Sequence, residues 1–343
     1  MKPFATPALS PFPPQVPLTR RRLVTAAAAA AATSMLAAPR VRAQAGFPNR
    51  AVTIIVPYTA GGASDIGARM LSSGMASVLG QPVLIDNVPG AGGALGVQKL
   101  LRASPDGHTI LYGSLSETVL VPMINPAANY RTEDMAAIAL AGAVPAAFVT
   151  RPDFPANTMA EFIAHARKNP GRLSYGSPGI GTFQHLLTEI VKEKTGIFVL
   201  HIPYRGGSNI MTDVVAGQID VGVTTVPNVI GLAAQGRVKV LGISSAQRVP
   251  VLDKVAGFTE TPALTGLDLQ TWGMLLAPKG TPEAVLQRLN AVTTQVVMAP
   301  AMAEQRRKLG STVAGPFTPA QTQAFLLAER DTYRLAASRV KPE

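Results

Sequence analysis

Two glycine-rich turns are the segments of this sequence best suited to bind a ligand. In TIIVPYTAGGASD (residues 53–65) an apolar stretch runs into Gly61 and Gly62, which let the backbone turn sharply, and Ser64 is the predicted N-cap of the following helix. The first turn of a helix has unpaired N–H groups and about half a positive charge, so an anion binds there without a basic side chain. Asp65 either complements the helix dipole or accepts a hydrogen bond from the ligand or the loop.

The second turn, in LSYGSPGIGTFQHL (residues 173–186), repeats this arrangement. An apolar stretch enters a run with Gly176, Gly179 and Gly181, and Thr182 is the predicted cap of a helix whose apolar residues recur at helical spacing. If the two turns face one cleft, the two helix N-termini hold an anion between them. Glycine turns after strands are common in α/β proteins, so neither turn alone defines a function.

Other kinds of site find less support in the sequence. Neither turn has the lysine of a phosphate-binding P-loop, and NVPGAGGALG (residues 87–96) has the wrong spacing for a dinucleotide fingerprint. The four histidines lack metal-ligand spacing and there is no cysteine. Ser177 and His185 are a conceivable nucleophile and base, but no G-x-S-x-G motif surrounds them, and His185 is better explained as a capping or packing residue. We therefore expect a binding protein without metal or cofactor, not an enzyme.

The elements that position the two turns are predicted from periodicity. Apolar runs of strand length alternate with amphipathic helical stretches, which predicts an α/β fold with mostly parallel sheets. Helix starts are expected at Thr158, at Thr281 and at Thr318, from their capping patterns. The predicted strands are residues 52–58, 109–112, 146–150, 173–175, 198–202, 221–224, 238–243 and 273–277.

Proline-rich crossings near residues 152 and 248 divide the chain. They predict two lobes with a cleft between them: residues 46–145 and 246–343 form one lobe, and residues 146–245 form a second lobe inserted into it. The two glycine turns then belong to different lobes.

The first 45 residues have the parts of an export signal. Arg20, Arg21 and Arg22 precede a short alanine-rich run, and Ala43-Gln44-Ala45 is a processing site, so cleavage is expected near Ala45. The arginines fit a twin-arginine (Tat) signal and also an ordinary Sec signal. Without cysteine the chain has no site for a lipoprotein anchor, so we expect a freely soluble periplasmic monomer that is not inserted in the membrane.

The formal net charge of +11 is partly a property of the signal. Residues 1–45 contain six basic residues and no acidic one, which leaves 25 basic and 20 acidic residues in the remaining chain. Those basic residues are scattered and are not interleaved with aromatic ones, so nucleic acid is not an expected partner. A mild positive balance suits a small anionic ligand.

Seven segments together, in their order and spacing, resemble the periplasmic solute-binding proteins of tripartite tricarboxylate transporters, the Bug family. The segments are VPYTAGGASD, NVPGAGGALG, LSYGSPGIGTFQHL, IPYRGG, GQIDVG, VKVLGISSAQR and LLAPKGTP. The resemblance covers essentially the whole chain after residue 45. It implies a two-lobed type 2 periplasmic binding fold, each lobe a mostly parallel sheet flanked by helices, that closes on a small organic carboxylate.

The resemblance also implies which residues bind. The two turns hold the ligand carboxylate, partly through water, and YRGG lines the cleft with Tyr204 as a wall, while Arg205 either binds the ligand or pairs structurally. Where family members commonly have an aspartate, this chain has Thr224 and Thr225, which disfavours an amino-acid ligand. The expected ligand-binding residues are Tyr58, Thr59, Ala60, Gly61, Gly62, Ser64, Asp65, Ser177, Pro178, Gly179, Gly181, Thr182, His185 and Tyr204.

The expected function is capture of a small organic carboxylate in the periplasm and its delivery to the permease subunits of a tripartite tricarboxylate-type transporter. One alternative is a sensor partner that presents its ligand to a membrane receptor. Another is a secreted serine hydrolase that uses Ser177 and His185.

Overall fold

The computed structural model describes residues 46–313 and 315–338, and the predicted export signal with its cleavage site lies outside these ranges. From Phe47 onward the chain forms one unit, built on a single path of hydrogen-bonded strands. The strand order is β2-β1-β3-β9-β4-β7-β5-β6, with β8 paired to β4. The first lobe contains β1, β2, β3 and β9, and the second lobe contains β5 to β8.

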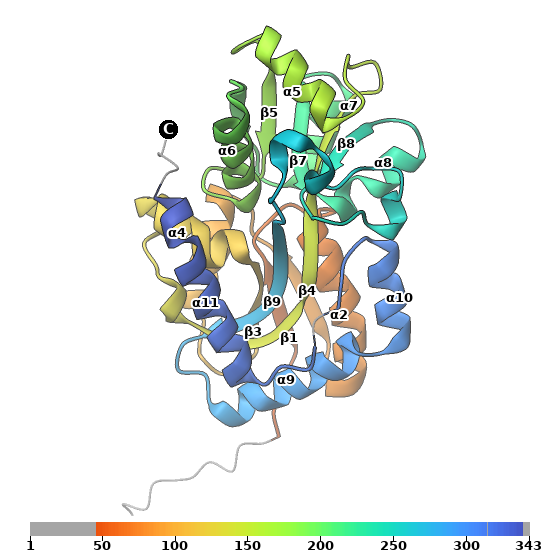
Figure 1. Cartoon of the computed structure of the whole chain (residues 1–343). Helices are drawn as coiled ribbons and strands as arrows, with labels where there is room; N and C mark the ends of the chain where they lie inside the picture. The colour runs from red at the N-terminus through yellow and green to blue at the C-terminus, as the bar shows by residue number, and fades with distance from the viewer. Residues whose placement is uncertain (1–45, 314, 339–343) are drawn as a thin grey trace, which may run out of the picture. The chain divides into compact units, whose positions relative to one another are not determined.

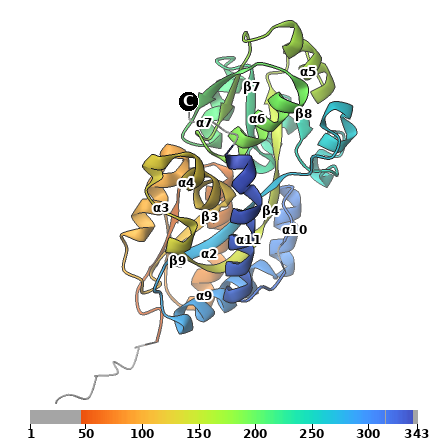
Figure 2. The ribbon, with the colours of Figure 1, turned by 60° about the vertical axis from the view of Figure 1, so that its left-hand side comes forward.

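The first lobe is a mixed sheet with helices on both faces. β1 pairs in parallel with β2 and β3, and β9 runs antiparallel to β3. The strands are β1 (Val52–Val56), β2 (Val83–Asn87), β3 (Thr109–Ser114) and β9 (Gln270–Pro278). The helices are α2 (Ala63–Leu79), α3 (Ala94–Leu101), α4 (Val121–Ile124), α9 (Glu283–Val297), α10 (Pro300–Lys308) and α11 (Pro319–Ala337). Figure 2 shows α11 lying along β4.

The second lobe is smaller. β5 pairs in parallel with both β6 and β7. The strands are β5 (Ser174–Ser177), β6 (Leu200–Pro203), β7 (Val221–Thr225) and β8 (Lys239–Ile243). The helices are α5 (Met159–Lys168), α6 (Phe183–Thr195), α7 (Gly207–Val215) and α8 (Ile230–Ala234).

One long strand, β4 (Met135–Thr150), runs through both lobes (Figure 1). Its residues 135–145 pair antiparallel with β9, and its residues from Ala146 onward pair antiparallel with β7 and β8. The register along β9 shifts between Leu140 and Gly142, so the strand is irregular shortly before it changes partners. This change of partners falls at the first predicted lobe boundary, residue 145; the boundaries themselves stay a prediction.

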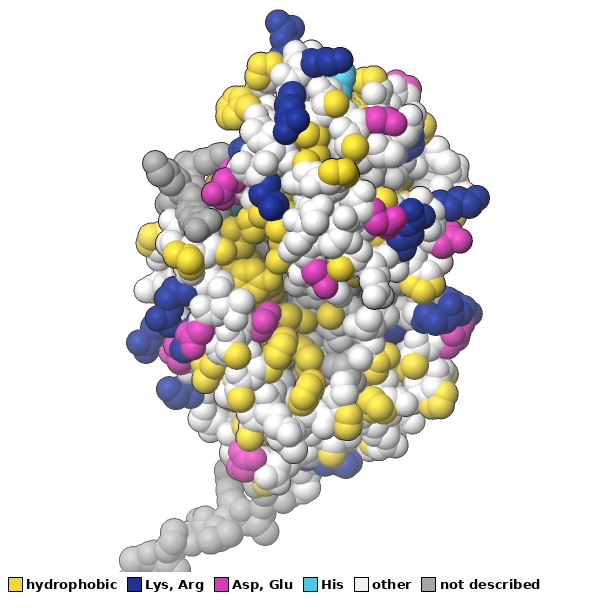
Figure 3. All heavy atoms as spheres, viewed as in Figure 1, with side chains coloured by type: hydrophobic (Ala, Val, Ile, Leu, Met, Phe, Trp, Pro, Cys, Tyr) yellow, Lys and Arg dark blue, Asp and Glu magenta, His cyan; other side chains and the backbone are white. Residues whose placement is uncertain are grey.

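The core is apolar, as the composition requires. In the first lobe, buried residues of α2 and α9, such as Leu71, Met75 and Leu289, pack against one face of the sheet. In the second lobe, Ile210 and Val214 of α7 belong to a smaller apolar cluster. On the face of the molecule in Figure 3, Lys and Arg side chains are interspersed with Asp and Glu. Among the described residues, no helix combines the length and the apolar character needed to cross a membrane.

The predicted strands all exist, but two strand regions were missed. β2 is a half-exposed edge strand with Asp86 and Asn87, and the first part of β4, MAAIALAGAV, is rich in alanine, which has low strand propensity. Because β4 and β9 run antiparallel to their neighbours, the sheet is mixed.

The predicted helix caps had mixed outcomes. Thr158 and Thr318 cap α5 and α11 through their side chains, as expected. The cap expected at Thr281 is wrong: the N-cap of α9 is Pro282, and the Thr281 hydroxyl instead donates to the carbonyl of Pro278. Ser64 is also not a cap, because the N-cap of α2 is Gly62.

Candidate functional site

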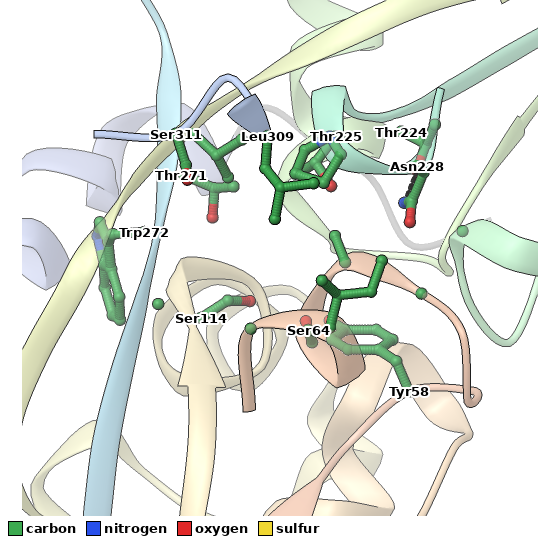
Figure 4. Close-up of a pocket in the computed structure, with 18 of the residues that line it drawn as sticks. Tyr58, Ser64, Ser114, Thr224, Thr225, Asn228, Thr271, Trp272, Leu309 and Ser311 are labelled. Atoms are coloured by element: carbon green, nitrogen blue, oxygen red, sulfur yellow. Dashed lines mark hydrogen bonds between the residues drawn. The ribbon is translucent and has the colours of Figure 1, made fainter. Parts of the chain in front are cut away.

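A pocket lies where the two lobes meet (Figure 4). Tyr58 reaches it from the loop after β1, Ser64 from the start of α2, and Thr271 and Trp272 from β9. The second lobe contributes its own lining, which includes Pro178, Gln184, Gly207, Thr224, Thr225 and Asn228. A ligand in this pocket therefore touches both lobes.

The first predicted turn borders the pocket with the open end of α2. Gly61 adopts a left-handed conformation with φ of 75°, and Gly62, at the N-cap, supplies no side-chain cap. The first-turn N–H groups of α2 are therefore not capped by the residue that precedes them. Gly62 and Ser64 both line the pocket, so the predicted anion site at this helix end faces the cleft.

Asp65 holds the first turn in shape. Its carboxylate accepts hydrogen bonds from the Gly61 N–H and from Arg69 Nε, both at 2.9 Å, and from Asn87 Nδ2 at 3.1 Å. Asn87 Nδ2 also donates to the carbonyl of Tyr58 at 3.1 Å. Burial alone would raise the pKa of Asp65, but these hydrogen bonds outweigh it and hold the pKa below its ordinary value. The side chain is thus committed to the loop and does not line the pocket.

The second predicted turn satisfies most of its own polar groups. The Gly181 N–H donates to His185 Nδ1 at 3.1 Å, and the Thr182 hydroxyl donates to the Gly179 carbonyl at 2.7 Å. The N–H of Phe183, in the first turn of α6, donates to Ser116 Oγ of the first lobe at 2.9 Å. In this conformation a side chain from the opposite lobe therefore occupies the N-terminus of α6, and Pro178 is the predicted residue of this turn that lines the pocket.

Ser177 and His185 do not form the pair that a hydrolase would need. Ser177 Oγ lies 2.7 Å from Nε2 of His201, and the His201 ring stacks on that of His185 with centroids 4.2 Å apart. Burial lowers the pKa of both histidines, that of His201 to about 3, so both are neutral near pH 7. Ser177 is fully buried and does not line the pocket, so this cluster supports the β5–α6 turn from behind.

The remaining predicted residues lie beside the pocket. Thr59 shares a hydrogen bond with Ser208, and the carbonyl of Ala60 accepts one from the same hydroxyl. Tyr204 does not form the pocket wall: its ring packs near Gly176 and its hydroxyl donates to Asp213 at 2.7 Å. Arg205 is exposed and does not line the pocket.

Glu117, which the sequence analysis did not single out, lies directly behind the pocket lining. Its side chain is fully buried and accepts hydrogen bonds from Tyr58 Oη at 2.8 Å, from Ser114 Oγ at 2.7 Å and from the Ser114 N–H. Burial raises the pKa of Glu117 to about 7, although the hydrogen bonds oppose the rise. The same burial, with the nearby carboxyl, raises the pKa of Tyr58.

Several buried polar atoms of the lining have no hydrogen-bond partner among the described residues. They are Thr271 Oγ1, Asn228 Oδ1, and Nε and Nη2 of Arg306, and all three residues line the pocket. Most buried polar groups in proteins are hydrogen-bonded, so a concentration of unpaired ones marks a place where a ligand completes the bonding. Among these unpartnered atoms, the two nitrogens of Arg306 belong to a group with a full positive charge.

The sequence analysis missed Arg306 because the residues around it have the pattern of a solvent-exposed helix face. It belongs to the run EQRRK at the end of α10, where basic residues suit the helix dipole. Met302 and Arg306, four residues apart, are the buried residues of this helix. Because residues four apart lie on the same face of a helix, the position of Arg306 four residues after the apolar Met302 is the sequence signal that predicts its burial.

Within the described residues, no group of three or more acidic, histidine or cysteine side chains is placed to hold a metal ion. The polar groups of the lining are backbone N–H groups, hydroxyls, the side-chain amides of Gln184 and Asn228, and the guanidinium of Arg306.

The fold, two α/β lobes with a pocket between them, defines the class of periplasmic binding proteins, and the comparisons with known proteins bear this out. The family model described as "Tripartite tricarboxylate transporter family receptor" matches residues 67–334, so the chain belongs to that family. The resemblance to Bug proteins is confirmed.

Curated relatives extend over most of the chain. A protein from Pseudomonas sp. (strain P51), named "UPF0065 protein in tcbD-tcbE intergenic region", is 36% identical over 297 residues, which cover 86% of this chain and 87% of that protein. Protein BugT of Bordetella pertussis is 30% identical over 316 residues, covering 90% of this chain and 94% of BugT.

Solved structures agree with the fold. The periplasmic binding protein BugD is 29% identical with a TM-score of 0.82, covering 87% of this chain and 100% of BugD. MatC (Rpa3494) of Rhodopseudomonas palustris, solved with bound malate, is 28% identical with a TM-score of 0.80 and coverages of 85% and 100%. R. palustris Rpa4515, solved with adipate, is 25% identical with a TM-score of 0.82 and coverages of 86% and 98%.

Proposed function

We propose that this protein captures a small organic carboxylate between its lobes and delivers it to the membrane permease subunits of a tripartite transporter. The observation that carries the proposal is the pocket itself, which combines the uncapped N-terminus of α2 with buried, unpartnered polar atoms on three residues, one of them a cation. Two similar solved proteins hold malate and adipate, both carboxylates, which supports the same ligand class here.

Contacts across the cleft indicate how the ligand is enclosed. Thr59 and Ser208 share one hydrogen bond between the lobes, and Ser116 accepts another from the Phe183 N–H. A ligand drives closure only by as much as it prefers the closed form. A pocket lined from both lobes supplies that preference, because the ligand completes its contacts only when these cross-cleft bonds have formed.

Of the residues predicted to bind, we propose that Tyr58, Gly62, Ser64 and Pro178 contact the ligand, since they line the pocket. Of the other predicted residues, Thr59 and Ala60 contact Ser208 of the second lobe and Tyr204 bonds Asp213, while the rest belong to the two turns. The proposed lobe boundaries remain residues 145 and 245, supported at the first by the change of partners along β4. Thr224 and Thr225 add hydroxyls but no negative charge to the lining, which suits a carboxylate without an ammonium group.

The proposed protein works as a periplasmic monomer, exported by the N-terminal signal that the sequence predicts. Its direct partners are the ligand and the permease. Binding, closure and release need no bond to be made or broken in the ligand, so the proposed function requires no catalytic residue.

A first experiment uses residues 46–343, unfolded and refolded to remove bound ligand, and a panel of mono-, di- and tricarboxylates. A ligand at about 100 times its Kd adds roughly 2.7 kcal/mol to stability, which raises Tm by several degrees. Trp272, the single tryptophan of the chain, lines the pocket, so a change in its fluorescence reports binding from one known place. No response of either signal to any carboxylate would overturn the proposal.

A matched pair of variants tests the location of the site. Thr271→Val removes an unpartnered hydroxyl from the pocket and is expected to weaken binding roughly 2- to 10-fold. Thr150→Val removes an equally buried, unpartnered hydroxyl in β4 outside the pocket and should leave affinity unchanged. Equal effects of the two changes would place the ligand elsewhere.

A further inference from the structure

We propose that Arg306 is a specificity-determining residue that binds a second carboxylate of the ligand, separate from the one held at the N-terminus of α2. This inference rests on the proposed function and adds to it one residue and one charge requirement. Under it, the pocket selects dianionic ligands over monoanionic ones of the same shape.

The buried guanidinium of Arg306 has two nitrogens without a hydrogen-bond acceptor in the described part of the chain. The residue is 5% exposed and lines the pocket, yet its Nε and Nη2 atoms have no acceptor among the described residues. These two nitrogens lie on one edge of the planar guanidinium, the edge that donates two parallel hydrogen bonds to a carboxylate. A buried charge without a partner costs stability, so its presence in a pocket calls for a ligand that pairs with it.

The protein supplies no counter-ion of its own to this guanidinium. Among the ion pairs of the described residues, Arg307 next to it pairs with Glu304 at 2.9 Å, and Arg330 pairs with Asp331, but none involves Arg306. The buried carboxyl of Glu117 accepts hydrogen bonds from Tyr58 and Ser114. The Tyr112 hydroxyl is close to both charges: burial raises its pKa, Arg306 lowers it through its charge and a side-chain hydrogen bond, and the charge of Glu117 adds to the rise.

The second site is distinct from the helix end. The Tyr112 hydroxyl lies against Gly67, because a Cβ on Gly67 would approach it to 2.4 Å. Gly67 is one turn, roughly 5 Å along the axis, beyond the first residues of α2. On the other side, a Cβ at Gly142 of β4 would come within 2.8 Å of Arg306 Nη1, so the glycine leaves space for the guanidinium. Arg306 therefore reaches the pocket beside Tyr112 and β4, and not at the first turn of α2.

The test compares matched ligands on matched variants. The ligands are succinate, glutarate and adipate, each against its half-amide, which keeps the shape and loses one negative charge. The proteins are the refolded wild type of residues 46–343, Arg306→Gln, Arg306→Lys and the control Arg307→Gln, which removes the same charge from an exposed neighbour outside the pocket. Binding is measured by Trp272 fluorescence and by calorimetry.

For the best of the three dicarboxylates, we expect the wild type to bind the half-amide at least about 30-fold more weakly, since losing one partner of a buried charge pair costs 2 kcal/mol or more. Arg306→Gln should lose that preference, binding diacid and half-amide nearly equally. Arg306→Lys should keep part of it, because an ammonium retains the charge without the planar fork. Arg307→Gln should behave as the wild type.

The outcomes separate the two proposals. Equal wild-type affinity for each diacid and its half-amide, or an undiminished preference in Arg306→Gln, overturns the role of Arg306 and leaves carboxylate binding standing. No binding of any diacid, half-amide or monocarboxylate overturns both. Because the wild-type ratio needs no variant, the test holds even if Arg306→Gln fails to fold.

Discussion

Thr59 Oγ1 and Ser208 Oγ lie 2.8 Å apart and share a hydrogen bond across the cleft, although the two residues are 149 positions apart in the sequence. Ser208 also donates to the carbonyl of Ala60 at 3.3 Å. Gly206 permits this approach, since a Cβ there would lie 2.3 Å from Thr59 Oγ1. The two lobes are therefore joined here by two hydroxyls whose residues do not line the pocket.

Removing this hydrogen bond should weaken ligand binding, although neither Thr59 nor Ser208 lines the pocket. We expect Thr59→Val and Ser208→Ala each to reduce affinity roughly 2- to 10-fold, because a hydrogen bond contributes about 0.5–1.5 kcal/mol to the closed form. A double-mutant cycle on Kd measures the pair directly, and the double variant should be no weaker than the weaker single one. Strictly additive effects would show that the two hydroxyls act separately.

Asp65→Asn should destabilise the protein at neutral pH and lose this effect in acid. Its pKa is lowered in the folded state, so its contribution is present above the ordinary value of 3.8 and is lost as pH falls through the lower folded value. We expect a loss of about 1–3 kcal/mol at pH 7 from the hydrogen bonds of a buried carboxylate. Urea unfolding at several pH values measures it.

The control for this change is Asp153→Asn, which alters an exposed carboxylate paired with Arg151. Exposed pairs contribute little, so its unfolding free energy should follow that of the wild type. If Asp65→Asn were as mild as the control at pH 7, the Asp65 carboxylate would not be holding the turn.

Glu117 should give the opposite pH dependence. Its pKa rises from 4.5 to about 7 on folding, so its contribution is fully present below pH 4.5 and is lost as pH rises through about 7. Between these values the native state binds more protons than the unfolded state, and stability falls with rising pH. Glu117→Gln should flatten the curve over this window. If the free energy of unfolding of the wild type rose between pH 5 and pH 7 and that of Glu117→Gln did not, the raised pKa of Glu117 would be wrong.

Arg306→Met should stabilise the ligand-free protein. The change removes a buried charge without a counter-ion among the described residues and keeps a side chain of similar length. Stabilising substitutions of this kind commonly raise the free energy of unfolding by roughly 0.5–2 kcal/mol. The urea midpoint of refolded protein should rise, while Arg307→Met, on the exposed face, should stay within about 0.5 kcal/mol of the wild type. A lower midpoint for Arg306→Met would mean that the guanidinium is satisfied without ligand.

Local patterns predicted local structure well. The side-chain cap at Thr158, the capping box at Thr318 and the strands before the two glycine turns depend on neighbours in the chain, and the structure has them. The box predicted at Thr158 is incomplete, because Glu161 accepts from the N–H of Asn157 and not from that of Thr158. The cap expected at Ser64 failed because Gly62 already has the extended backbone that an N-cap needs, so the helix begins two residues earlier.

Features that depend on contacts between residues far apart in the chain could not be predicted from the sequence. His201, 24 residues beyond Ser177, is its partner only because β6 pairs with β5. Glu117 and Arg306 carry the charges at the pocket, yet neither stands in a glycine turn or a motif. Their roles follow from burial, and burial of a charged residue depends on how distant elements pack.

The continuity of β4 has a consequence for how the ligand enters. Because one strand is hydrogen-bonded into both lobes, we expect the lobes to open by rotating about a line near this strand and not by sliding past each other. Atoms near such an axis move little, so we expect Thr271 and Trp272, which pair with β4, to keep their positions in the pocket lining. The hydrogen bond between Thr59 and Ser208 joins the two lobes, so it has to break when they open. We therefore expect the lining on β9 to decide which ligand fits, and the contact between the lobes to decide the ligand's residence time.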